Sequence, residues 1–158
     1  MRIGNRFDVN CAQVTSLDGI SLPWVTELRY LGVHILSSRK FKCSLDYAKR
    51  AFYHAANAIF GKVSRAASEE VVLQLIKSKC YPVLRYGLEA IVLNNVDKNS
   101  IDFTAKRFFM KLFRTVNSEI TTDCQTFFGI DSASLRLSKL TVQFVARCST
   151  TINYICNL

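Results

Sequence analysis

The first part of the chain follows a strand-like pattern of apolar and polar residues. Short segments at 2–7, 11–15 and 28–35 alternate or are rich in aromatic and β-branched residues, as strands are. Between the last two, Asp18 and Gly19 form a dipeptide that favours a tight turn. We therefore expect a β-hairpin. Because two or three strands with one apolar face are marginally stable, this hairpin should need another surface to lie on.

From Ser44 onward the apolar residues recur with a helical period. Ser44 is placed as an N-cap, and a single apolar stripe follows it: Leu45, Ala48, Phe52, Ala55, Ala56, Ile59 and Val63. A second helix is predicted to begin near Ser68, followed by Glu69 and Glu70, which suit the helix dipole. This helix is broadly apolar and should be central, and Pro82 should kink or divide it.

Two further helices are predicted at about 97–115 and 134–155. The earlier one places on its buried side Ile101, Ala105, Phe108, Phe109, Leu112 and Val116. Several threonines weaken the later one. The sequence thus predicts an α+β fold, in which a β-hairpin over 1–40 precedes a mostly helical domain of about four helices over 41–158.

The charge of the chain indicates what it binds. Lys and Arg number 21 against 12 Asp and Glu, which gives a formal net charge of +9. A field of this sign attracts polyanions, whose condensed counterions are released on binding. Nucleic acid is the partner that the charge favours, and the alternative is a basic domain whose charge only prevents association.

Cysteine and histidine usage argues against a metal site or a disulfide scaffold. The six cysteines are widely spaced without a C-x-x-C motif, and His34 and His54 have no ligand-spaced partner. The N-terminus lacks the apolar core of a signal peptide, and no apolar run approaches the roughly 18 residues that span a bilayer. We expect free thiols in a reducing, intracellular compartment, nucleus or cytoplasm, and no membrane segment.

The predicted third helix carries a cationic face. At 3.6 residues per turn, an arc of about 140° holds Phe103, Met110 and four cations: Lys106, Arg107, Lys111 and Arg114. Arginine can bind phosphate oxygens bidentately, so this face is a candidate nucleic-acid-binding surface, with a merely solvated face as the alternative. Lys49 and Arg50, on the polar side of the first helix, form a weaker candidate.

Three motifs, taken in order, suggest a family. They are Leu28-Arg-Tyr-Leu-Gly-Val33, Phe41-Lys-Cys-Ser-Leu-Asp-Tyr-Ala-Lys-Arg50 and Pro82-Val-Leu-Arg-Tyr-Gly-Leu-Glu89. Together they resemble the C-terminal part of the reverse transcriptase domain of LINE-type (non-LTR) retrotransposons. The resemblance covers nearly the whole chain.

This resemblance implies that 1–40 is the end of a palm and that 41–158 is a thumb. In that family the hairpin carrying the Tyr-Leu-Gly strand holds the primer end, and the helices grip the template–primer duplex. By position, the primer-grip residues would be Arg29, Tyr30, Leu31 and Gly32. A glycine on a strand permits close approach to a ligand, although Gly32 could equally mark a bulge in an ordinary sheet. The implied partners are an RNA template, a DNA primer, and the upstream palm and fingers of the same polyprotein.

The catalytic chemistry of that family is missing from the sequence. Polymerisation requires carboxylates that hold two Mg²⁺ ions, and the chain contains no adjacent Asp-Asp pair. In the family those aspartates lie in the palm, upstream of the first strand. We expect no catalytic residue, metal ligand or cofactor in this chain, which should be inactive alone although the complete polymerase uses Mg²⁺. The alternatives are a non-enzymatic nucleic-acid-binding or interaction protein derived from such an element, and an inactive truncated copy.

Overall fold

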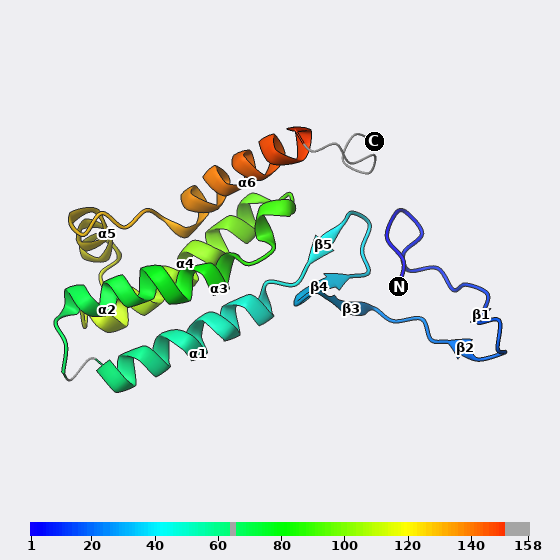
Figure 1. Cartoon of the computed structure of the whole chain (residues 1–158), viewed down its shortest axis with the longest axis horizontal. Helices are drawn as coiled ribbons and strands as arrows, with labels where there is room; N and C mark the ends of the chain where they lie inside the picture. The colour runs from blue at the N-terminus through cyan, green and yellow to red at the C-terminus, as the bar shows by residue number, and fades with distance from the viewer. Residues whose placement is uncertain (64–65, 151–158) are drawn as a thin grey trace. The chain divides into compact units, whose positions relative to one another are not determined.

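The computed structural model describes residues 1–63 and 66–150 (Figure 1). Antiparallel strands come first and helices follow, so the α+β fold class expected from the sequence is confirmed. The chain divides into two compact units, Met1–Leu45 and Asp46–Leu158. We describe each unit by itself.

Two antiparallel hairpins make up the first unit. β1 (Val14–Thr15) pairs with β2 (Ser21–Leu22), and between them Gly19 has a φ of 76°, as a tight turn requires. The second hairpin belongs to a three-stranded sheet of β3 (Glu27–Tyr30), β4 (Val33–Leu36) and β5 (Lys42–Cys43). The turn predicted at Asp18-Gly19 is confirmed, but it joins β1 to β2 and not to 28–35.

The strand predicted at 28–35 is in fact two strands joined by a turn. Tyr30 pairs with Val33, and the two residues between them have positive φ, 47° at Leu31 and 82° at Gly32. Two consecutive residues of this kind form a type I′ turn, whose twist matches that of the flanking strands. Gly32 is therefore a turn residue and not a bulge. The strand predicted at 2–7 is also wrong, since that segment forms turns and a single bridge from Ile3 to Ser38.

The first unit buries very few of its side chains. Within Met1–Leu45, all of which the structure describes, only Cys43 and Leu45 are buried. Large apolar side chains remain exposed along its strands and loops, among them Leu17, Trp24 and Leu28. A sheet of this size without a covered apolar face has little to stabilise it by itself.

The second unit is helical. Its described residues form six α-helices, with a π-helical turn at Ile76–Cys80 and a 3-10 turn at Leu88–Ala90. The α-helices are α1 (Asp46–Val63), α2 (Glu69–Leu75), α3 (Tyr81–Arg85), α4 (Asn95–Leu112), α5 (Ser118–Phe127) and α6 (Ala133–Thr150). No described helix is both long and apolar enough to cross a membrane.

Pro82 divides the second predicted helix, as expected. The helical path runs from α2 through the π-helical turn into α3, where Pro82 occupies the first turn. Proline lacks an N–H group, and its ring clashes with the carbonyl four residues earlier, so a widened turn before it relieves the helix. Gly87, with a φ of 72°, follows α3 in the left-handed conformation.

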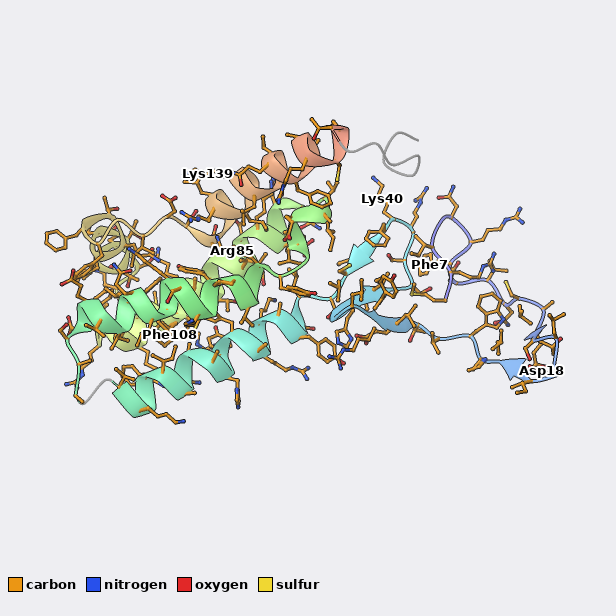
Figure 2. All side chains as sticks on the ribbon, viewed as in Figure 1. Phe7, Asp18, Lys40, Arg85, Phe108 and Lys139 are labelled. Carbon is orange, nitrogen blue, oxygen red and sulfur yellow. The ribbon has the colours of Figure 1, made fainter. Side chains whose placement is uncertain are left out.

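Aromatic rings form the centre of the helical unit. Phe52 of α1 and Phe108 and Phe109 of α4 are buried, as the sequence predicted. Figure 2 labels Phe108. The Phe108 ring centroid lies 6.2 Å from that of Phe52, 6.4 Å from that of Phe60 and 6.1 Å from that of Phe109. Tyr81 of α3 joins the cluster, 6.5 Å from Phe109. These rings join α1, α3 and α4 into one core.

The third predicted helix is shorter at its C-terminus than its apolar pattern indicated. α4 ends at Leu112, and Arg114 has a φ of 51°, a left-handed conformation that stops a helix. Val116 is 95% exposed instead of buried, because it no longer follows the helical stripe. Arg114 likewise lies outside the helix whose face it was expected to share.

The last two helices differ from expectation in different ways. α5 was not predicted, since its threonines have low helix propensity, yet the Asn117 side chain caps it by accepting a hydrogen bond from the backbone N–H of Glu119 at 2.8 Å. α6 confirms the fourth predicted helix as far as Thr150. Its predicted continuation to 155 lies outside the described residues.

Candidate nucleic-acid interface

The cap and core of α4 fix which of its faces meets solvent. The Asn94 side chain accepts a hydrogen bond from the backbone N–H of Asp97 at 2.7 Å and so caps the helix. The buried positions form one continuous face: Ile101, Thr104, Ala105, Phe108, Phe109 and Leu112. The helical period therefore leaves the opposite side of α4 to solvent.

This exposed side, which we call the outer face of α4, is basic. It consists of Val96, Asn99, Phe103, Lys106, Arg107, Met110 and Lys111. Arg107 is exposed, Lys106 is half-buried, and Phe103 beside them is 59% exposed. The two carboxylates of the helix point elsewhere, because Asp97 belongs to its first turn and Asp102 accepts hydrogen bonds from Ser134 of α6. No carboxylate of α4 compensates the cations of this face.

Lys111 joins the outer face of α4 to α1. Its Nζ lies 2.9 Å from Oδ1 of Asn57 and 5.0 Å from the ring centroid of Phe60. These contacts hold the ammonium group at the border between the two helices. An ammonium has three N–H donors, so it can still donate to a phosphate from this position.

The two cations predicted on α1 differ in their surroundings. Arg50 is exposed, with its guanidinium carbon 5.3 Å from the ring centroid of Tyr47. It precedes Asn57 by two helical turns on the same strip, about 10 Å along the axis, so it borders the same α1–α4 surface as Lys111. Lys49 is half-buried and forms an ion pair with Asp46 at 3.8 Å, which reduces its value as a phosphate ligand.

The predicted cationic arc is thus retained in part. Lys106, Arg107 and Lys111 lie on α4, with Lys106 and Lys111 at opposite edges of its outer face, about 140° apart. Arg114 is exposed, but it lies beyond the end of α4 and has a left-handed backbone conformation, so it does not continue this face.

The primer-grip-like residues lie together at the tip of a hairpin in the first unit. Arg29 and Tyr30 end β3, and Leu31 and Gly32 form the turn. Tyr30 is 61% exposed and Leu31 is 73% exposed. The positive φ of Gly32 accounts for a glycine at this position, so the glycine does not require a bound ligand to explain it. The exposed side chains of Tyr30 and Leu31 are the groups of this turn that could contact a ligand.

A second basic cluster in the helical unit was missed by the sequence reasoning. Lys77, Arg85 and Arg136 line a cavity of about 190 Å³ together with the buried Tyr81. The cluster draws on the π-helical turn, α3 and α6. Helical periodicity relates residues on one helix only, and no sequence signal marked this set.

The part of the chain that the structure describes contains neither a pair of reactive thiols nor a metal site. Cys11, Cys43, Cys80, Cys124 and Cys148 are free, and burial raises the pKa of the Cys80 thiol to about 11, so this group keeps its proton at neutral pH. No described group of three His, Cys, Asp or Glu could hold a metal ion.

The chain was compared with known families, proteins and structures. No family model, curated protein or solved structure matches it. Its function is therefore inferred from the sequence motifs, the charge and the geometry of the described residues.

Proposed function

We propose that this chain is the primer-gripping end of the palm and the thumb of a reverse transcriptase from a non-LTR retrotransposon. In this proposal the helical unit holds the RNA–DNA template–primer duplex, and the catalytic aspartates lie in another part of the polymerase. The observation that carries the proposal is the outer face of α4, where Lys106, Arg107 and Lys111 form no ion pair with a carboxylate of residues 1–63 or 66–150. The three sequence motifs support it.

The chemistry of the outer face of α4 suits a nucleic-acid backbone. Arg107 and Lys111 are one helical turn apart, about 6 Å along the axis, and Arg50 extends the basic surface along α1. Guanidinium and ammonium groups bind phosphate oxygens, while Phe103 and Met110 offer apolar surface to the sugars. Such contacts recognise the shape and charge of a duplex and not its base sequence.

The first unit supports the same proposal. A tight turn presents Tyr30 and Leu31 at its tip, where an aromatic ring and an aliphatic side chain can rest against the sugar or base at a primer end. The many exposed apolar side chains of this unit suit a surface that packs against the sheet of a palm. We therefore propose the upstream palm as the occupant of that surface.

Removing charge from the outer face of α4 should reduce the salt dependence of duplex binding. Each phosphate contact makes the slope of log K against log salt concentration more negative by about 0.9, since each releases condensed counterions. The double variant Lys106→Ala with Arg107→Ala should flatten this slope by about two units. Fluorescence anisotropy with a labelled RNA–DNA duplex, over a series of salt concentrations, measures it.

A control pair on α1 and α6 separates contact from overall charge. Lys62→Ala with Arg147→Ala removes the same two charges from exposed positions outside the outer face of α4, and its slope should equal that of the unaltered chain. Equal slopes in all three proteins would remove the outer face of α4 from the interface. Equal flattening by both pairs would show that net charge, and not this face, drives binding.

The dependence of the first unit on a palm predicts its dynamics. Amide hydrogens of 1–36 should exchange rapidly in the isolated chain, because this unit buries few side chains, whereas those of α1 and α4 should be protected by the aromatic core. Hydrogen–deuterium exchange with mass spectrometry measures both in one sample. Protection of 27–36 as strong as that of α4 would mean that the hairpin folds independently and needs no palm.

The aromatic core of the helical unit also favours a second candidate, a non-enzymatic nucleic-acid-binding module. A helical unit with its own core can fold and bind without a polymerase around it. Primer extension separates the two: the chain mixed with a palm-and-fingers segment from the same element should restore extension under the first proposal. Duplex binding without any such restoration would favour the second.

A further inference from the structure

The cavity in the helical unit lies away from the proposed duplex interface. It is lined by Lys77, Tyr81, Arg85 and Arg136 and by the loop from Gly129 to Asp131, none of which belongs to the outer face of α4. Figure 2 labels Arg85 on α3, which lies beside α6. The volume of the cavity is about 190 Å³, many times the roughly 10–15 Å³ that one water molecule requires. The cavity therefore has room for a polyatomic ion.

Two arginines bring positive charge to this cavity. Arg85 is half-buried, its Nε donates to the backbone carbonyl of Tyr81 at 3.1 Å, and its guanidinium carbon lies 5.6 Å from the Tyr81 ring centroid. Burial, followed by the positive charge of Arg136, lowers the pKa of Arg85. Neither arginine forms an ion pair with a carboxylate in the described part of the chain. Two guanidinium groups that repel each other favour an anion between them.

Tyr81 adds a donor that has no partner. The residue is only 6% exposed, and its hydroxyl makes no hydrogen bond with any residue that the structure describes. Burial, and to a smaller extent the charge of Asp102, raise the pKa of Tyr81, so the hydroxyl keeps its proton and can donate. A buried polar group without a partner destabilises a protein, and Tyr81 lines the cavity, so an anion bound there would supply the missing acceptor once the hydroxyl reaches it.

The remaining charges around the cavity leave its balance positive. Lys77 donates from Nζ to the backbone carbonyl of Phe128 at 2.9 Å, and this contact holds its ammonium group at the cavity wall. Asp131 also lines the cavity, but its Oδ2 lies 3.1 Å from the Nζ of Lys139, which neutralises it. Glu89 acts on Arg85 only as the weakest of its charge contacts, and Asp102, whose charge acts on Tyr81, accepts hydrogen bonds from Ser134. Against these carboxylates stand the three cations Lys77, Arg85 and Arg136.

We propose that this cavity binds a phosphate group through Arg85, Arg136, Lys77 and the Tyr81 hydroxyl. A phosphate presents more oxygen acceptors and more negative charge than a carboxylate, and so suits three cations and a hydroxyl better. Its source is either a free phosphate or phosphate monoester, or a backbone phosphate of a nucleic acid. The proposal stands without the duplex grip, because the two sites share no residue.

Isothermal titration calorimetry of the full chain with inorganic phosphate tests the site, with sodium acetate as the carboxylate comparison. The unaltered chain should bind phosphate saturably and more tightly than acetate. Arg136→Gln, at an exposed position, should raise the dissociation constant at least tenfold, and Tyr81→Phe should raise it about tenfold through loss of one hydrogen bond to a charged group. Arg147→Gln removes the same charge from α6 outside the cavity and should leave it unchanged.

Three outcomes of these titrations would overturn the proposal. These outcomes are no saturable phosphate binding, equal weakening by Arg136→Gln and Arg147→Gln, and unchanged affinity in Tyr81→Phe with its fold intact by circular dichroism.

An RNA–DNA duplex without terminal phosphates then identifies the source of the phosphate. Weaker duplex binding by Arg136→Gln, with displacement of the duplex by inorganic phosphate, indicates a backbone phosphate. Unchanged duplex binding, beside weakened phosphate binding, indicates a free phosphate or monoester.

Discussion

Phe108→Ala should lower the free energy of unfolding of the helical unit by about 3–5 kcal/mol, the range for truncating a buried phenylalanine. Phe108 is 2% exposed, and its ring makes T-shaped contacts with the rings of Phe52, Phe60 and Phe109. The substitution leaves a cavity where α1 and α4 join, and both helices are held by other contacts, so the space cannot collapse fully. Urea unfolding followed by far-ultraviolet circular dichroism measures the change.

Phe103→Ala is the matched control for this prediction. It makes the same substitution on the same helix, but Phe103 lies on the outer face of α4 and is 59% exposed, so its loss should cost less than about 1 kcal/mol. If Phe103→Ala were instead the more destabilising of the two, the buried and exposed faces of α4 would be reversed. The outer face would then not be available to a nucleic acid.

The helical half of the fold could be predicted because its signals are local. The buried residues Phe52, Phe108 and Phe109 belong to apolar stripes with the 3.6-residue period of a helix. Such a stripe arises whenever one side of a helix faces the core. Pro82 interrupts a helix through its own covalent structure, whatever surrounds it. Such features need no knowledge of distant residues.

The strands were harder to predict because the residues at one turn do not look like a turn. The segment Tyr30-Leu31-Gly32-Val33 is almost wholly apolar, and leucine rarely adopts a positive φ. Only pairing of Tyr30 with Val33 across the hairpin makes Leu31 take this conformation. The register of two strands, and not local propensity, determined the turn.

The two basic sites differ in the same way. Lys106, Arg107 and Lys111 belong to one helix, so its period alone brought them to one face, and only the early end of α4 removed Arg114. Arg85 and Arg136 come from α3 and α6, and they meet because α3 lies beside α6 in the folded unit. A site assembled from separate elements requires the tertiary structure.

Tyr81→Phe should raise the free energy of unfolding of the phosphate-free chain by about 1–3 kcal/mol, the cost of leaving a buried polar group without a partner. The substitution keeps the ring, and with it the contacts to Phe52 at 6.3 Å and Phe109 at 6.5 Å and the Arg85 guanidinium at 5.6 Å. Only the hydroxyl is lost. Urea unfolding in a phosphate-free buffer measures the gain, and Tyr86→Phe, at an exposed tyrosine of the same segment, should change stability by less than about 0.5 kcal/mol.

Added phosphate should reduce the stability difference between the two proteins if the cavity binds it, by up to about 1.4 kcal/mol for a tenfold difference in affinity. A ligand that binds the folded state stabilises it in proportion to its affinity, so phosphate should stabilise the unaltered chain more than Tyr81→Phe. A tyrosine that served packing alone would give the same difference with and without phosphate. Lower stability of Tyr81→Phe in the phosphate-free buffer would mean that the hydroxyl already has a partner in the folded chain, and the structural reason for an anion at Tyr81 would then be gone.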